Sequence, residues 1–185
     1  FSEAVQKNTI KIKDSTCPAI HAALQASEKG IPFIPLRGLI GSDVLKHRDD
    51  WQVISNPFNK KGGPIVLLPA IRPDVALIHA PVADRSGNVW IGKRRELVTM
   101  AHAAKTTLVT VEKTQDENLL EDELTAAGTI PNMYIEMIAE AEMGCWPLGL
   151  SGCYPPDNKA ITEYVEESLT QAGFLNWLKK NRGRK

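Results

Sequence analysis

A stiff, mostly apolar stretch at residues 31–43 contains polar side chains that could act on a substrate. Its sequence, IPFIPLRGLIGSD, has two prolines, two glycines and one arginine. Prolines restrict the backbone, whereas glycines let a ligand or another backbone approach closely. Arg37 could hold a carboxylate or carbonyl, and Ser42 could donate a hydrogen bond to an acyl oxygen. The alternative is a buried crossover loop in which Arg37 pairs with a carboxylate of the chain itself, and the residue types leave both interpretations open.

A second polar group, at residues 84–88, has the composition of a tight turn. Asp84 can accept hydrogen bonds from backbone N–H groups two residues on, and Gly87 and Asn88 tolerate positive φ. The spacing therefore predicts a structural turn at Asp84, Gly87 and Asn88, without a chemical role.

Metal binding is not predicted anywhere in the chain. The acidic run at residues 116–123 is typical of a solvated helix face, and a charge run does not imply convergent ligands. Cys17, Cys145 and Cys153 are odd in number and contain no C-x-x-C pair, so they are interpreted as reduced thiols of a cytoplasmic protein.

Short apolar runs indicate the scaffold that would position these groups. Residues 65–68 and 75–78 are too short for helices and rich in β-branched side chains, which favours strands buried on both faces. Residues 89–91 resume as a strand after the turn. A helix over 97–104 followed by a strand over 106–111 predicts an α/β fold, with a mixed, largely parallel sheet covered by helices.

The flanking segments carry weaker patterns. A helix is expected to begin near Pro18 and end at Gly30, with Ile20, Ala23, Leu24 and Ser27 on one face. Further elements are expected as strands at 9–13 and 51–54, a helical turn at 43–50, an amphipathic helix at 158–171 and a final helix with aromatic packing near 174–178.

Bulk properties predict a soluble globular protein. The 185 residues suit a single domain, expected over 1–178, followed by a basic tail over 179–185. The formal net charge of 0 gives no global field that would attract nucleic acid or an anionic membrane surface. No apolar run approaches the roughly 18 residues that a membrane span requires. From the charge and from the absence of such a run, neither nucleic acid nor a membrane is an expected partner.

The stretch at residues 69–92, PAIRPDVALIHAPVADRSGNVWIG, resembles the alpha chains of family I coenzyme A transferases. Within that family it is most similar to the glutaconate CoA-transferase alpha branch. His79, Asp84, Gly87 and Asn88 occupy the places of a family pattern in which a strand ends in His and is followed by Asp and Gly-Asn. Residues 30–43 and 97–134 contain further matches, and together the resemblance covers about residues 1–150.

The resemblance implies a CoA-transferase or sugar-phosphate isomerase-like fold and an alpha-type subunit of an acyl-CoA:carboxylate CoA-transferase. Coenzyme A would be a substrate and not a permanently bound cofactor, and acyl-CoA and a carboxylic acid would be the small-molecule partners. The family places the loop with Arg37, Gly38, Gly41 and Ser42 near its acyl-binding region. The nucleophilic glutamate would come from a beta-type partner, in a Ser-Glu-Asn-Gly-like motif that is absent from this sequence. No catalytic residue is therefore predicted in this chain.

Two alternatives remain open. The family also contains ring-opening acyl-CoA hydrolases, whose alpha chain carries an acidic residue upstream of the Pro-Phe-x-Pro loop. In this sequence that position falls near Cys17, which disfavours a hydrolase. The related fold also serves as a non-catalytic metabolite sensor, since fold does not fix function. The chain begins inside the family pattern, so it is expected to be either a fragment of a longer chain or a chain whose opening part was lost or belongs elsewhere.

Overall fold

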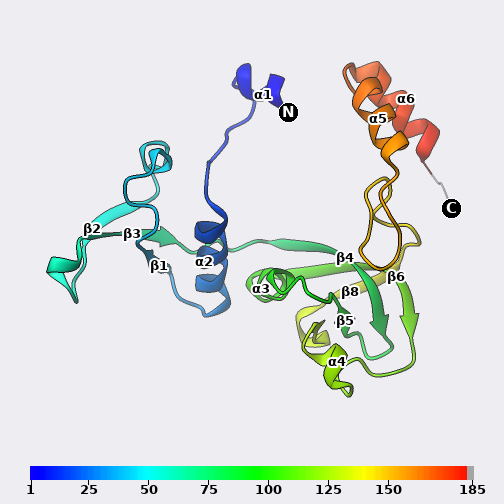
Figure 1. Ribbon diagram of the computed structural model, residues 1–185, viewed down its shortest axis with the longest axis horizontal. Helices are drawn as coiled ribbons and strands as arrows, with labels where there is room; N and C mark the ends of the chain where they lie inside the picture. Colours follow the sequence, from blue (N-terminus) through cyan, green and yellow to red (C-terminus); the bar gives the residue numbers. More distant parts are fainter. Residues whose placement is uncertain (183–185) are drawn as a thin grey trace. The chain divides into compact units, whose positions relative to one another are not determined.

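The computed structural model describes residues 1–182, which form two compact units (Figure 1). The first comprises residues 1–74 and 102–105, and the second comprises residues 75–101 and 106–182. Both combine helices with β-sheet, which confirms the mixed α/β fold class. The single domain over 1–178 stays a prediction. Of the expected basic tail, Lys179 and Lys180 belong to the last helix, and residues 183–185 lie outside the described residues.

The first unit is a three-stranded antiparallel sheet with α2 packed against it. The sheet order is β1-β3-β2. The elements are α1 (Ser2–Gln6), α2 (Cys17–Glu28), β1 (Phe33–Leu36), the 3-10 turn η1 (Asp43–His47), β2 (Gln52–Ser55), the 3-10 turn η2 (Lys60–Gly62) and β3 (Pro64–Pro69).

Helix α2 begins and ends where its sequence signals predict, but it buries a different face. The Thr16 hydroxyl caps its first turn by accepting a hydrogen bond from the Ala19 N–H, and Gly30 follows its end with φ +67°. The buried stripe consists of four alanines, Ala19, Ala22, Ala23 and Ala26. Ile20 is 42% exposed, so the expected apolar face was wrong. The small alanine side chains let the helix approach the sheet closely.

Three local predictions were also wrong. Residues 9–13 form no strand, because no described strand pairs with them. Residues 33–36 are strand β1 and not loop; Pro35 is tolerated because β1 is an edge strand. The acidic run at 116–123 is mainly turns, and the short helix α4 (Glu123–Ala126) begins only at its end.

The second unit is a five-stranded mixed sheet with helices. Its sheet order is β7-β5-β4-β6-β8, in which β4, β6 and β8 run parallel while β5 and β7 form antiparallel pairs. The elements are β4 (Val75–Asp84), β5 (Val89–Trp90), α3 (Glu96–Ala103), β6 (Thr106–Gln115), α4, β7 (Thr129–Ile130), the 3-10 turn η3 (Asn132–Tyr134), β8 (Met137–Glu140), α5 (Asn158–Glu167) and α6 (Gln171–Asn181).

The two faces of this sheet differ sharply in burial. Ile78 and Val111 lie on the face that packs against α3 and η3 and forms the core. On the opposite face an apolar row, Leu77, Leu108 and Met137, crosses the three parallel strands in register. Leu77 is 73% exposed and Met137 is 63% exposed. Strand β4 is therefore not buried on both faces as expected, because no described residue covers this row.

Helices α5 and α6 lie side by side at the carboxyl end of the described chain (Figure 1). The ring of Trp177 stacks on that of Trp146 at a centroid distance of 5.9 Å and meets Tyr164 edge-on at 4.9 Å. This aromatic contact confirms the predicted docking of the final helix. Among residues 1–182, no helix is both long enough and apolar enough to cross a bilayer.

The turn after β4 is held by a buried carboxylate. Asp84 is only 3% exposed, and its two oxygens accept hydrogen bonds from the Asn88 backbone N–H (3.0 Å), the Asn88 side-chain amide (2.8 Å) and the Leu119 N–H (3.0 Å). Gly87 has φ +88°, which a residue with a side chain rarely adopts. Burial raises the pKa of Asp84, but the hydrogen bonds outweigh burial, so the pKa is lowered overall.

We predict that Asp84→Asn lowers the free energy of unfolding by about 2–3 kcal/mol, because an amide group would face N–H donors at a site that needs only acceptors. Folding lowers the pKa of Asp84, so its contribution is present above the unfolded-state pKa of about 3.9 and is lost as the pH falls through the folded-state value. Urea denaturation at several pH values measures this. Asp49→Asn, at a solvated side chain, is the control; equal losses in the two variants would contradict the prediction.

Candidate functional site

A half-buried polar network joins the middle of β4 to the neighbouring part of β6. Its centre is the Glu112 carboxylate, which receives hydrogen bonds from His79 Nε2 (2.7 Å) and the Tyr154 hydroxyl (2.7 Å). The backbone N–H groups of Met143 and Gly144 complete the set at 2.8 and 3.1 Å. Several polar groups that converge on one point of a sheet mark a region to examine for a site.

The His79 ring has no nitrogen left for a substrate. Nε2 donates to Glu112, because an ionised carboxylate can only accept, and Nδ1 contacts the Thr110 hydroxyl at 2.8 Å. The His79 and Glu112 side chains are each 13% exposed. A general base needs a free nitrogen within reach of the proton it removes. His79 therefore fixes structure and does not act as a catalytic base in this arrangement.

The network stabilises the charged form of Glu112. Burial raises the pKa of Glu112, but the hydrogen bonds from Tyr154, His79 and the two backbone N–H groups outweigh burial and lower the pKa overall. Burial and the neighbouring carboxylate raise the pKa of Tyr154, so its hydroxyl keeps its proton and remains a donor.

The same network ties an irregular segment, residues 141–154, to the sheet. The Ala141 N–H donates to the Val111 carbonyl, and the Tyr154 hydroxyl also accepts from the Cys145 N–H at 2.9 Å. Leu150 and Tyr154 exchange two backbone hydrogen bonds, which close a small loop whose tip is residues 151–153. This loop is therefore held in place by the Glu112 network.

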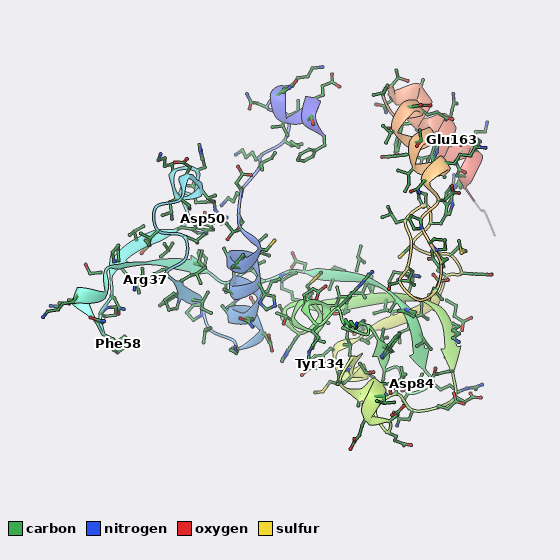
Figure 2. All side chains as sticks on the ribbon, viewed as in Figure 1. Arg37, Asp50, Phe58, Asp84, Tyr134 and Glu163 are labelled. Carbon is green, nitrogen blue, oxygen red and sulfur yellow. The ribbon has the colours of Figure 1, made fainter. Side chains whose placement is uncertain are left out.

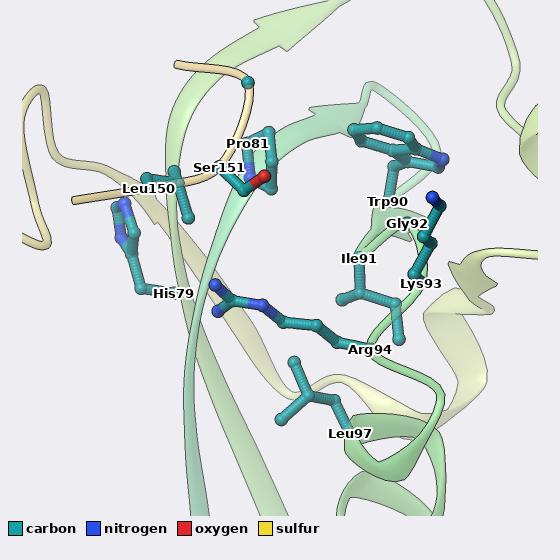
Figure 3. Close-up of a pocket in the computed structure, with 11 residues that line it drawn as sticks. His79, Pro81, Trp90, Ile91, Gly92, Lys93, Arg94, Leu97, Leu150 and Ser151 are labelled. Atoms are coloured by element: carbon teal, nitrogen blue, oxygen red, sulfur yellow. The ribbon is translucent and has the colours of Figure 1, made fainter. Parts of the chain in front are cut away.

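The loop forms one wall of a cavity of about 320 Å³ within the second unit (Figure 3). The lining residues come from β4, the end of β5, the following turn, α3 and the loop; they are His79, Pro81, Trp90, Ile91, Gly92, Lys93, Arg94, Leu97, Leu150, Ser151 and Gly152. In Figure 3 the Arg94 side chain extends across the cavity toward His79, and Lys93 lies beside Trp90. Most of the lining is apolar, with a few polar groups, as in small-molecule sites generally.

The cavity can bind a ligand but contains no activated nucleophile. Ser151 is its only hydroxyl-bearing lining residue, and His79, the only imidazole in the lining, is fully hydrogen-bonded. Among residues 1–182, no group of three or more His, Cys, Asp or Glu side chains could hold a metal ion.

The predicted substrate-binding residues lie in the first unit, and the predicted turn residues in the second (Figure 2). Arg37 is exposed and forms no ion pair or hydrogen bond with a described residue, so the alternative in which it pairs with a carboxylate is not seen. The Ser42 hydroxyl donates to the Leu39 carbonyl at 2.8 Å. Gly41 has φ +84°, and the space around Gly38 is open. None of the four lines the 320 Å³ cavity, and their substrate roles stay predictions.

The sequence analysis missed the residues that shape the cavity. Glu112 directly follows the predicted strand over 106–111, but β6 continues to Gln115, so Glu112 lies within the strand and its position offered no clear signal. Lys93 and Arg94 follow a short strand directly and precede a helix, and a basic run at that place is a usable signal. Tyr154 has no local signal, because it reaches Glu112 only through the folded loop.

The fold and cavity define an α/β protein with a ligand-sized cavity beside the middle of β4. Residues 21–141 match the family described as Coenzyme A transferase. This match covers more than half of the sequence, and the chain therefore belongs to the coenzyme A transferase family.

Curated relatives place the chain beside the A-type subunits of that family. It is 30% identical to the A-type subunit of glutaconate CoA-transferase from Acidaminococcus fermentans, over 94% of this chain and 59% of the relative. It is 30% identical to the A-type subunit of 3-oxoadipate CoA-transferase from Pseudomonas knackmussii, over 95% of this chain and 62% of the relative. A cholesterol ring-cleaving hydrolase IpdA subunit of Mycobacterium tuberculosis is 26% identical over 96% of this chain and 63% of the relative. The chain thus spans about three fifths of these relatives.

Solved structures that are similar to this chain include a member of the same family. The glutaconate coenzyme A-transferase of Acidaminococcus fermentans matches with a TM-score of 0.86 at 27% identity, over 97% of this chain and 61% of that chain. The decarboxylase AibA/AibB matches with a TM-score of 0.85 at 26% identity, over 99% of this chain and 66% of that chain. The chain is therefore similar in fold to CoA-transferases and to a decarboxylase.

We predict that Gly144→Ala destabilises the protein by about 2 kcal/mol or more, because a Cβ at this position would lie 2.4 Å from Cε1 of His79. The ring would have to move and would weaken its hydrogen bond to Glu112. Chemical denaturation of the full protein measures the effect. Gly38→Ala is the matched control, because no atom lies within 4 Å of its added Cβ. Identical midpoints for the two variants would show that the contact between Gly144 and His79 does not constrain the fold.

Proposed function

We propose that this chain is the alpha-type subunit of an acyl-CoA:carboxylate CoA-transferase, and that it supplies walls of the substrate site. The observation that carries the proposal is the similarity to the A-type subunits of two CoA-transferases over nearly the whole chain. The enzyme would transfer coenzyme A from an acyl-CoA to a free carboxylic acid, without a permanently bound cofactor. A cytoplasmic location stays a prediction.

The nucleophile is assigned to a beta-type partner. The chain has no Ser-Glu-Asn-Gly motif. Its half-buried Glu112 accepts four hydrogen bonds, three on Oε1 and one on Oε2, and these bonds hold it against groups of this chain. Glu166 and Glu167 belong to α5 and do not line the 320 Å³ cavity.

The uncovered apolar row of the five-stranded sheet supports association with further protein. Leu77 and Met137 are largely exposed, with Leu108 between them on the same face. Contiguous apolar surface of this kind marks interaction sites in stable proteins. A partner chain, or a further portion of the same polypeptide, would cover it.

The proposed reaction proceeds through two covalent intermediates on the partner. Its glutamate attacks the thioester carbonyl, and coenzyme A leaves as a thiolate, so an acyl-glutamyl anhydride remains. The thiolate then attacks the glutamyl carbonyl and releases the first acid, which leaves a glutamyl-CoA thioester. The second carboxylate then attacks the glutamyl-CoA thioester, which releases the coenzyme A thiolate and forms a new anhydride. The thiolate attacks the new acyl carbonyl of this anhydride, so the new acyl-CoA leaves and the glutamate is restored. The alpha chain would contribute orientation, which alone can lower a barrier by several kcal/mol.

A ring-opening acyl-CoA hydrolase is the second candidate. The similarity to a cholesterol ring-cleaving hydrolase IpdA subunit over 96% of this chain favours it. Against it, the place near Cys17 where that branch carries an acidic residue has none, with Thr16 and Pro18 beside it. A DNA-binding helix-turn-helix extension in the full-length protein would instead favour a metabolite-sensing role.

We predict that the covalent adduct forms on the partner chain. The assembled complex is incubated with acyl-CoA and then with borohydride, which reduces a glutamyl thioester to an alcohol, and mass spectrometry locates the modified residue. The purified alpha chain alone should show neither transfer nor adduct. A reduced glutamate in this chain would overturn the division of roles, and ring-opening hydrolysis without any adduct would favour the hydrolase.

We predict that Arg37→Lys lowers kcat/KM of the assembled complex by about tenfold or more, although the charge is kept. The planar guanidinium can bind a carboxylate or carbonyl through two parallel hydrogen bonds, and an ammonium cannot reproduce that geometry. Steady-state kinetics measure the change. Arg72→Lys, an exposed residue of the same unit, is the control. Unchanged kinetics in Arg37→Lys would remove Arg37 from the site.

A further inference from the structure

A second cavity, of about 350 Å³, lies within the first unit between helix α2 and the end of β3. Its apolar lining includes Ala19, Ile20 and Ala23 on α2, together with Trp51, Leu68 and Ile71. Ile20 and Ile71 are 42% and 40% exposed, so two branched side chains of the lining have little cover from the described residues. Neither Arg37 nor any residue that lines the 320 Å³ cavity belongs to this lining, so the second cavity is separate from both regions considered above.

The charged groups of this cavity already neutralise one another. Arg48 donates two parallel hydrogen bonds to the Asp50 carboxylate, at 2.7 and 2.9 Å. The hydrogen bond from Arg48 is the main reason that the pKa of Asp50 is lowered, so this carboxylate stays ionised. Lys13 lies 3.3 Å from Asp50 and 3.9 Å from Asp49. The two cations and the two carboxylates cancel, so this cavity has no net charge that would attract an ionic ligand.

The walls of the cavity are fixed by contacts within the first unit. Besides its ion pair, the Arg48 guanidinium donates to the Asp14 carbonyl at 2.9 Å and lies 4.0 Å from the centre of the Trp51 ring. The Ile71 N–H donates to the Ala23 carbonyl at 3.1 Å, which ties the chain after β3 to α2. Because these walls are in place before a ligand arrives, the ordering cost of binding is reduced.

Ser15 supplies an uncharged polar group to the lining. This residue is half-buried, and its hydroxyl forms no hydrogen bond with any residue in the described range 1–182. A hydroxyl can donate one hydrogen bond and accept others without carrying a charge. Apolar cavities of about 150 Å³ bind benzene, so a volume of about 350 Å³ leaves room for a six-membered ring with a substituent. A small neutral molecule with one hydroxyl group therefore matches the lining in both size and polarity.

We propose that this cavity binds a small uncharged alcohol, with its hydrocarbon part against Ile20, Ile71 and Trp51 and its hydroxyl bonded to Ser15. An ion of the same shape is disfavoured, because it would lose hydration and would find each counter-charge already paired. The proposal goes beyond the transfer reaction, since its ligand is neither an acid nor a thioester and its site contains no residue assigned to that reaction.

Titration of the assembled complex with cyclohexanol, followed by saturation-transfer NMR, tests the site. Cyclohexanecarboxylate and cyclohexylammonium have the same ring with a negative or a positive charge, and each should bind at least tenfold more weakly than cyclohexanol. Ala70→Leu enlarges a half-buried side chain of the lining and should weaken cyclohexanol binding at least tenfold. Ala4→Leu, at a half-buried position outside the lining, is the matched control and should leave the affinity within twofold.

A second pair of variants tests the hydrogen bond and is less prone to disturb folding. Ser15→Ala should weaken cyclohexanol binding about fivefold, which is the usual effect of one lost hydrogen bond. Ser55→Ala, at an exposed serine of β2 outside the lining, should leave the affinity within twofold. Far-UV circular dichroism shows whether each variant folds, and Ser15→Ala decides the question if Ala70→Leu does not.

Three results would overturn the proposal: no binding of cyclohexanol, binding of either charged analogue as tight as that of cyclohexanol, or an affinity that changes no more in the folded lining variants than in their controls. A complex that binds cyclohexanol through Ser15 but transfers no coenzyme A would refute the proposed function and leave this site standing. A complex that transfers coenzyme A but does not bind cyclohexanol would refute the site alone.

Discussion

The Glu112 carboxylate organises the part of the chain in which the candidate site lies. Withdrawing a carboxylate from water is costly unless donors replace the lost hydration. Here the donors come from three places: His79 on β4, the Tyr154 hydroxyl, and backbone N–H groups at residues 143–144. Because the charge needs all of them, a strand, a neighbouring strand and an irregular segment are held in one arrangement. The position of the cavity wall at Leu150 therefore depends on the same hydrogen bonds.

The secondary structure that could be predicted is the part set by local signals. Apolar runs marked β3, β4 and β6, and Pro18 and Gly30 marked the ends of α2. Predictions failed where burial depends on a distant partner. Ile20 and Leu77 are apolar yet exposed, because what covers a face is decided by the packing of other elements and not by the pattern of the segment itself.

The site was harder to predict for a related reason. His79 and Glu112 are 33 positions apart, and Tyr154 lies 42 positions beyond Glu112. They meet because β4 and β6 pair in parallel, with His79 opposite Thr110. In addition, the irregular segment at residues 141–154 returns to β6 and brings the Tyr154 hydroxyl to Glu112. Lys93 and Arg94 were not singled out in the sequence, and only the folded structure places them on the lining of the cavity. Residue types suggested which side chains could do chemistry. Which of them meet is determined by the register of the strands and by the path of the loop that carries Tyr154.

The state of the two buried carboxylates bears on where the reaction takes place. Hydrogen bonds lower the pKa of both Asp84 and Glu112, and the same donors that stabilise these anions make them weaker bases and weaker nucleophiles. A glutamate that attacks a thioester must instead be held at contact distance from the thioester carbonyl. In this chain the Asp84 carboxylate holds the turn after β4, and the Glu112 carboxylate holds the loop that forms one wall of the cavity. Because both carboxylates have structural roles, we favour an active site that is completed by a reactive carboxylate from outside the described residues.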